Sequence, residues 1–105
     1  MRKLFRSCLF AFSLAFLSSH TLAQETIVQG KVIDANSGDA VPFVNIVFKG
    51  TYIGTTTDFD GNYLIKSTHP TDSLQASYIG YVIKSKVVSK GIRQTINFQL
   101  LEETG

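Results

Sequence analysis

From residue 24 onward, apolar and polar residues alternate with a period of two, which is the pattern of strands that have one buried face. The segment 95–100 (TINFQL) shows this most clearly, with Ile96, Phe98 and Leu100 on one face and polar residues between them. The period of 3.6 that predicts an amphipathic helix does not occur after residue 23. A chain with this pattern is restricted to all-β folds.

The alternating segments are short and evenly spaced. Turn-forming Asn, Asp, Gly, Ser and Pro residues separate them, so that strands recur at intervals of roughly 8–12 residues. The expected strands cover residues 27–33, 43–49, 52–57, 63–66, 74–79, 81–88 and 95–100. Seven short strands at this spacing predict an antiparallel β-sandwich that forms one domain.

The first 23 residues have the composition of a secretory signal peptide. Three basic residues come first, an apolar run follows at 9–17, and small residues at Thr21 and Ala23 precede a predicted cleavage site. The apolar run is too short to span a membrane, which needs about 20 apolar residues. We therefore expect cleavage after Ala23, export through the inner membrane, and a single domain at residues 24–105.

The single cysteine, Cys8, lies before the apolar run, where a lipid-attachment cysteine would not be placed. It is removed with the predicted signal peptide, so the domain contains no disulfide and depends on hydrophobic packing for its core.

The net charge of the predicted domain argues against a nucleic-acid partner. The full chain carries +2, but three of its ten basic residues belong to the predicted signal peptide. Seven Lys and Arg then remain against eight Asp and Glu, which gives the domain a net charge of −1. This balance, without a basic stripe, predicts no nucleic-acid partner. The mature chain is also not expected to span a membrane.

The motif TTTDFDGNY at residues 55–63 has three interpretations. As an EF-hand loop that starts at Asp58, it would need Gly at the sixth position and Glu at the twelfth, but Tyr63 and His69 stand there. A weak calcium site at Asp58 and Asp60 remains an alternative. A catalytic pair of carboxylic acids would need burial and a cleft, which a short turn rarely provides.

The third interpretation is structural, and it is the one favoured. Asp side chains bond to nearby backbone N–H groups, and Gly accepts a positive φ without steric cost. Asp58, Asp60 and Gly61 are therefore predicted to form the turn of a hairpin between the strands on either side.

Other chemistry has little support in the sequence. His69 is the only histidine after residue 23, whereas zinc sites and nucleophilic catalysis need a histidine or another base beside further ligands or a nucleophile. The glycines do not match a phosphate-binding loop. We therefore predict no catalytic residues, no cofactor and no enzyme activity. Three aromatic residues near turns form a candidate interaction surface for a sugar or a partner domain, unless they only cover loop ends: Tyr52, Phe59 and Tyr81.

Taken together, the segments VQGKVIDANSGDAVPFVNIVFKGTYIGTTTDFDGNYLI, LQASYIGY and TINFQL resemble the carboxypeptidase-regulatory-like domain (carboxypeptidase D regulatory-like) family. The resemblance covers about residues 27–101, and its clearest marks are KGT at 49–51, the 54–63 motif and SYIGY at 77–81. It implies a transthyretin-like Greek-key sandwich of seven strands. It also implies an accessory module without catalytic residues of its own, which in Bacteroidetes commonly precedes TonB-dependent outer-membrane receptors of the SusC-like type or other outer-membrane proteins.

The combined expectation is an exported, monomeric, non-catalytic module in the periplasm, at the outer membrane or at the cell surface. It would be the N-terminal part of a larger protein, with a downstream domain or an outer-membrane protein as its partner. Two alternatives stay open. One is the N-terminal extension of a TonB-dependent receptor for nutrient uptake, and the other is a weak glycan- or calcium-binding module.

Overall fold

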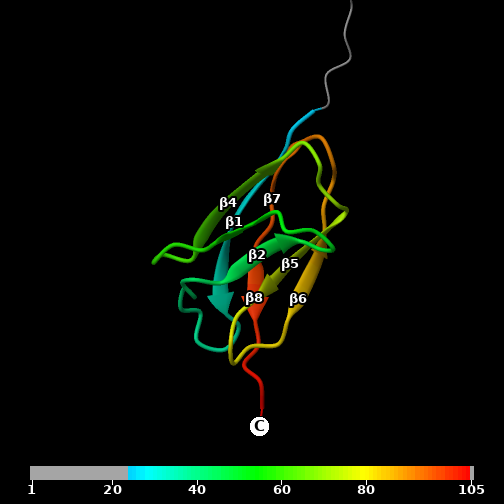
Figure 1. Cartoon of the computed structure of the whole chain (residues 1–105). Coiled ribbons are helices and arrows are strands. Elements are labelled where there is room, and N and C mark those ends of the chain that lie inside the picture. The colour runs from blue at the N-terminus through cyan, green and yellow to red at the C-terminus, as the bar shows by residue number, and fades with distance from the viewer. Residues whose placement is uncertain (1–23, 105) are drawn as a thin grey trace, which may run out of the picture.

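The computed structural model describes residues 24–104 (Figure 1). The predicted signal peptide at residues 1–23, with Cys8, lies outside the described residues. Strands are the only regular secondary structure in the part that is described. Eight strands follow one another: β1 (Thr26–Asp34), β2 (Asn45–Phe48), β3 (Gly54–Thr56), β4 (Asn62–Ser67), β5 (Ser73–Ser77), β6 (Lys84–Val87), β7 (Arg93–Thr95) and β8 (Phe98–Leu100).

The strands form two sheets. In the first sheet, β1 is central, with β4 antiparallel on one side and β7 and β8 parallel on the other. The second sheet has the order β3-β2-β5-β6 and is antiparallel throughout. The predicted all-β sandwich is confirmed.

The predicted strand count and pairing differ from the structure. The described residues form eight strands rather than seven, and β7 and β8 run parallel to β1, so the sandwich is not purely antiparallel. The extra strand arises because the predicted strand 95–100 is interrupted between β7 and β8 at residues 96–97.

Gly30 of β1 explains the interruption. A Cβ at this position would lie 1.8 Å from the carbonyl oxygen of Ile96, so the chain approaches β1 more closely here than a side chain would allow. The Tyr63 hydroxyl donates to the same carbonyl, and the Asn97 side chain accepts the N–H of Lys31 at 2.9 Å. Such a local break in a ladder is typical of a bulge. The alternation in the sequence continues through the break, so the pattern could not reveal it.

The core lies between the two sheets. Alternate residues of the segment that contains β2 (Val44, Ile46 and Phe48) are fully buried, as the sequence pattern predicts, and Phe98 and Leu100 of β8 face them from the other sheet. Burying a large apolar side chain contributes about 1.5–3 kcal/mol. Among the described residues, every member of this core lies between Val28 and Leu100.

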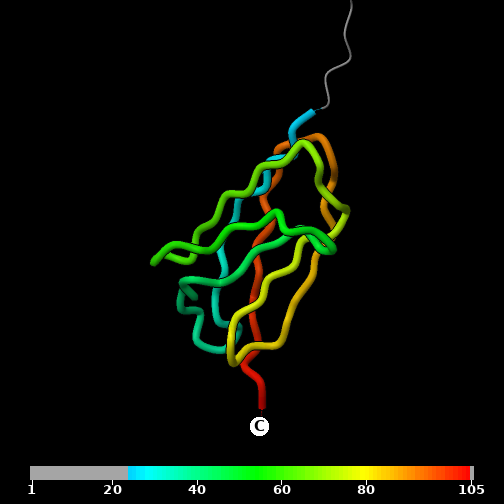
Figure 2. Tube along the Cα trace, in the orientation of Figure 1, coloured from blue at the N-terminus to red at the C-terminus, as the bar shows by residue number. Residues whose placement is uncertain are grey.

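The chain enters at one end of the sandwich and leaves at the other (Figures 1 and 2). We call the end with the last described residues the C-terminal pole; it consists of residues 35–44, 57–61, 78–83 and 101–104. The N-terminal pole, where β1 begins, consists of residues 24–25, 49–53, 68–72 and 88–92.

Candidate functional site

Asp58 organises the turn between β3 and β4. Its carboxylate accepts hydrogen bonds from the N–H groups of Asp60 (3.0 Å) and Asn62 (2.9 Å). Its backbone N–H donates to the carbonyl of Asn62 at 2.9 Å, and its carbonyl accepts the N–H of Gly61 at 3.0 Å. One oxygen of this carboxylate therefore serves its own turn, as Asp residues at turns commonly do.

The predicted hairpin at this turn is wrong, because the flanking strands belong to different sheets. β3 pairs with β2, whereas β4 pairs with β1. The chain leaves the sheet of β3 at Thr57, which is buried. Its hydroxyl donates to the carbonyl of Val41 (2.8 Å) and accepts the N–H of Val44 (2.9 Å), which ties the chain to the β1–β2 loop. The Asp58 turn is thus a corner between the two sheets.

Gly61 lets this corner pack against β1. Its φ is +78°, a conformation that favours glycine. An added Cβ would lie 2.6 Å from the carbonyl oxygen of Val32, and the Val32 N–H donates to the Gly61 carbonyl at 2.9 Å. Both the backbone conformation and the space available therefore require glycine.

Asp58 and Asp60 are both exposed. Among residues 24–104, no group of three or more His, Cys, Asp or Glu side chains is placed to hold a metal ion. The Asp58 turn thus offers two carboxylates, one of which already serves two backbone N–H groups.

A second carboxylate, Asp34 at the end of β1, has a richer environment. It is only 6% exposed. One oxygen accepts the N–H groups of Asn36 (2.8 Å) and Ser37 (2.9 Å), and the other accepts the hydroxyl of Tyr81 at 2.8 Å. Asp34 therefore joins the β1–β2 loop to the β5–β6 loop.

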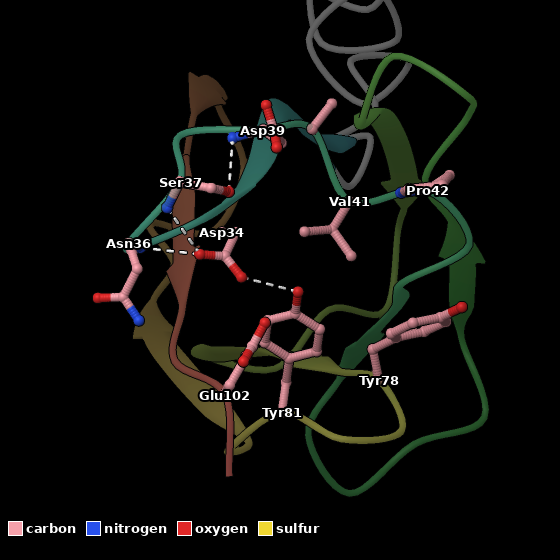
Figure 3. Close-up of a pocket in the computed structure, with 10 residues that line it drawn as sticks. Asp34, Asn36, Ser37, Asp39, Val41, Pro42, Tyr78, Tyr81 and Glu102 are labelled. Atoms are coloured by element: carbon pink, nitrogen blue, oxygen red, sulfur yellow. Dashed lines mark hydrogen bonds between the residues drawn. The ribbon is translucent and has the colours of Figure 1, made fainter. Parts of the chain in front are cut away.

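Asp34 and Tyr81 line a surface pocket of about 500 Å³ at the C-terminal pole (Figure 3). The rings of Tyr78 and Tyr81 lie 6.2 Å apart, and Tyr81 pairs with Glu102 through an isolated antiparallel bridge. The other lining residues are Asn36, Ser37, Asp39, Ala40, Val41 and Pro42. The pocket brings three carboxylates and two tyrosines together.

Hydrogen bonding shifts the pKa values of the Asp34–Tyr81 pair in opposite directions. The N–H of Ser37, followed by the Tyr81 hydroxyl, lowers the pKa of Asp34 below its ordinary value of 3.8. The bond to Asp34, followed by burial, raises the pKa of Tyr81 to about 12. At neutral pH the carboxylate is ionised and the phenol protonated, so Asp34 acts as a fixed acceptor rather than a proton carrier.

His69, the only histidine among the described residues, is far from both aspartate turns. His69 lies in the β4–β5 connection at the N-terminal pole, where its Nδ1 is 3.0 Å from the hydroxyl of Thr68. The structure therefore does not bring His69 together with Asp34 or Asp58.

The three aromatic residues of the predicted interaction surface do not share one surface. Tyr52 is fully exposed at the N-terminal pole. Phe59 and Tyr81 lie at the C-terminal pole, but Tyr81 is only partly exposed and bonded to Asp34. Phe59 instead stacks edge-to-face on Phe43, with ring centroids 5.3 Å apart.

Sequence reasoning missed Asp34. The string DANSGD at residues 34–39 contains two Asp and one Gly, as the Asp58 turn does, and its pattern predicts only a turn. Nothing in a local pattern shows that Tyr81, 47 residues away, reaches this carboxylate. Asp34 is the last residue of β1, a largely buried strand, and this position is the one indication that its side chain is buried.

Within the described residues, no helix is both long and apolar enough to cross a membrane.

The chain is similar to a short segment of two TonB-dependent receptors. Over 80 residues the chain is 44% identical to TonB-dependent receptor P3 of Formosa agariphila, a match that covers 76% of this chain and 8% of that receptor. It is 41% identical over 78 residues to TonB-dependent receptor SusC of Bacteroides thetaiotaomicron, covering 74% of this chain and 8% of the receptor. The chain thus spans only a small part of the length of these relatives.

Among solved structures, the TIE protein of Bacillus anthracis is similar over 75% of this chain and 17% of its own, with a TM-score of 0.49 and 15% identity. The family model of the CarboxypepD_reg-like domain matches residues 28–105, which include both aspartate turns and all eight strands except the first two residues of β1. The chain therefore belongs to the CarboxypepD_reg-like domain family.

Proposed function

We propose that this chain is the N-terminal, non-catalytic accessory domain of a TonB-dependent outer-membrane receptor that takes part in nutrient uptake. The observation that carries this proposal is the 44% identity to a TonB-dependent receptor, of which the matched segment is only 8%. A short match within a long receptor is expected when one domain of the receptor is shared. Transport itself would belong to the remainder of the polypeptide.

The geometry supports an accessory role rather than catalysis. Asp34 accepts three hydrogen bonds at its two oxygens and has a lowered pKa, so it is not available as a general acid at neutral pH. The Asp58 carboxylate serves its own turn. Both carboxylates therefore contribute to the shape of the C-terminal pole.

The gene provides the direct test. We expect the reading frame to continue past codon 105 into a receptor, and fractionation of the tagged full-length protein to place it in the outer membrane. Sequencing the N-terminus of the purified protein should begin at Gln24, after removal of the predicted signal peptide. A stop codon directly after Gly105 would contradict the receptor assignment, and an intact Met1 on the purified protein would contradict export by a cleaved signal.

A further inference from the structure

The last described residues are held against the β5–β6 loop. The N–H of Glu103 donates to the carbonyl of Gly80, and the N–H of Val82 donates to the carbonyl of Leu101, both at 2.8 Å. The two bonds flank the bridge between Tyr81 and Glu102. Residues 101–103 therefore form a short antiparallel pair with residues 80–82. A polypeptide that continues past residue 105 would start beside this loop.

Large apolar side chains are exposed at the same place. Ile79 is 88% exposed and Ile83 60% exposed, and both line an open surface pocket of about 320 Å³ together with Glu103. Val82 and Leu101, on the two paired segments, are about half exposed. We call these four residues the exit surface: Ile79, Val82, Ile83 and Leu101. Single exposed apolar residues are normal, but a group of this kind on adjoining segments is characteristic of a binding surface.

The charge around the exit surface restricts its occupant. The segments 35–44, 57–61, 78–83 and 101–104 contain no Lys or Arg. Lys84 directly follows Ile83, and its Nζ donates to the carbonyl of Gln99 at 3.4 Å. With the end of β1, the C-terminal pole carries six of the eight acidic residues of the chain: Asp34, Asp39, Asp58, Asp60, Glu102 and Glu103. Such a field repels anionic lipids and nucleic-acid phosphates and attracts cationic surfaces.

We propose that the exit surface docks a cationic, partly apolar surface on the polypeptide that follows residue 105. This inference rests on the proposed function, because it takes the domain to continue into a receptor. The tether favours this occupant over a free partner. Because such a surface is on the same polypeptide, its effective concentration at the exit surface is higher than that of a free partner, and it reaches the millimolar range when the linker is short. Domain contacts within one chain are commonly of modest size.

Hydrogen–deuterium exchange tests the docking in the full-length receptor in detergent. The reference is residues 24–105 alone, which contain every core residue of the described part of the chain. We expect slower exchange of amides in residues 78–83 and 101–104 in the full-length protein than in the fragment. Residues 49–53 and 88–92 at the N-terminal pole serve as the internal control, and their exchange should be equal in both proteins.

Matched variants connect this protection to the exit surface. Ile79→Ser together with Ile83→Ser removes apolar area that is already exposed, so the fragment should melt as the wild type does. The double variant should abolish the protection in the full-length protein. Val87→Ser is the control, because Val87 is 83% exposed but lies at the end of β6 nearest the N-terminal pole, and this variant should keep the protection.

The charge is tested in the same experiment. Glu102→Gln together with Glu103→Gln, or 0.5 M NaCl with the wild type, should reduce the protection, because both weaken attraction to a cationic surface. Protection that persists in the Ile79→Ser/Ile83→Ser variant would contradict the proposal. Protection that increases with concentration in residues 24–105 alone would assign the surface to a second copy of the domain, which also contradicts it.

The two proposals fail in different ways. If the reading frame does not continue into a receptor, the proposed function is wrong, and the gene sequence shows this before any exchange measurement. If the frame does continue and residues 78–83 exchange equally fast in both proteins, the receptor assignment stands and the docking is wrong.

Discussion

The two aspartate turns use one backbone device in two environments. In each, the Asp N–H donates to the carbonyl of the residue after a positive-φ glycine, and the Asp carbonyl accepts the N–H of that glycine. In each, one carboxylate oxygen accepts two backbone N–H groups. The Asp34 turn, however, is anchored through its carboxylate, which reaches Tyr81, whereas the Asp58 turn is anchored through its glycine, which packs on β1.

Similar turn sequences can therefore place the critical interaction on different residues. At the Asp34 turn the glycine, Gly38, has a φ of +77° and no atom within 4 Å of where its Cβ would be. At the Asp58 turn the carboxylate is exposed and only Gly61 is enclosed. Four experiments test this contrast between the two turns.

The largest effect is expected from the two glycines. Gly38→Ala should lower the free energy of unfolding by about 1 kcal/mol, the cost of a left-handed backbone for a residue with a Cβ. Gly61→Ala should lower it by about 3 kcal/mol or more, because the new Cβ also clashes with the Val32 carbonyl. Urea denaturation of both variants measures the difference. Equal losses would show that the Asp58 turn can move away from β1 without cost.

The next effect separates the two carboxylates. Asp34→Ala should lower the urea midpoint clearly, since it leaves the Tyr81 hydroxyl and two backbone N–H groups without their acceptor in a site that is only 6% exposed. Asp58→Ala should lower it only slightly, because water can reach the N–H groups of that exposed turn. A larger loss in Asp58→Ala would reverse the assignment of roles.

A third test uses pH. The pKa of Asp34 is lowered in the folded state, so its contribution to stability is present above its ordinary value of 3.8 and is lost as the pH falls below that value toward the folded-state pKa. The wild type should therefore lose more stability between pH 5 and pH 2 than Asp34→Asn does. Chemical denaturation at a series of pH values provides the comparison. Parallel curves for the two proteins would show that Asp34 has no special role in acid stability.

The smallest effect is expected from Tyr81→Phe, which removes only one of the three bonds to Asp34. The pKa of Asp34 should rise, but only part of its lowering should be lost, because the backbone N–H groups of Ser37 and Asn36 still bond to it. NMR titration of the Asp34 carboxyl carbon measures the shift. Tyr78→Phe is the control, since Tyr78 touches the ring of Tyr81 but is not bonded to Asp34. An unchanged Asp34 titration in Tyr81→Phe would contradict the coupling.

The sequence predicts the sandwich and most of its core, because the burial of alternate residues such as Val44, Ile46 and Phe48 is a local property of each strand. It does not predict which strands pair. The close approach of Ile96 to Gly30 and the separation of β3 from β4 depend on contacts between distant segments. The Asp34–Tyr81 bond was missed for the same reason. At the Asp58 turn, Asp58 and Asp60 lie two residues apart in the sequence, which suggests a site, but both side chains are exposed.

The parallel pairing of β1 with β7 and β8 also has a mechanical consequence. The first and last strands lie side by side, and the chain enters and leaves at opposite ends of the sandwich. Tension applied to the two termini would slide β1 along its neighbours in shear, so the hydrogen bonds of both ladders would resist together instead of opening one after another. Rupture under force is governed by the rate of unfolding. This geometry suits a domain that stays folded while it transmits tension between its two ends.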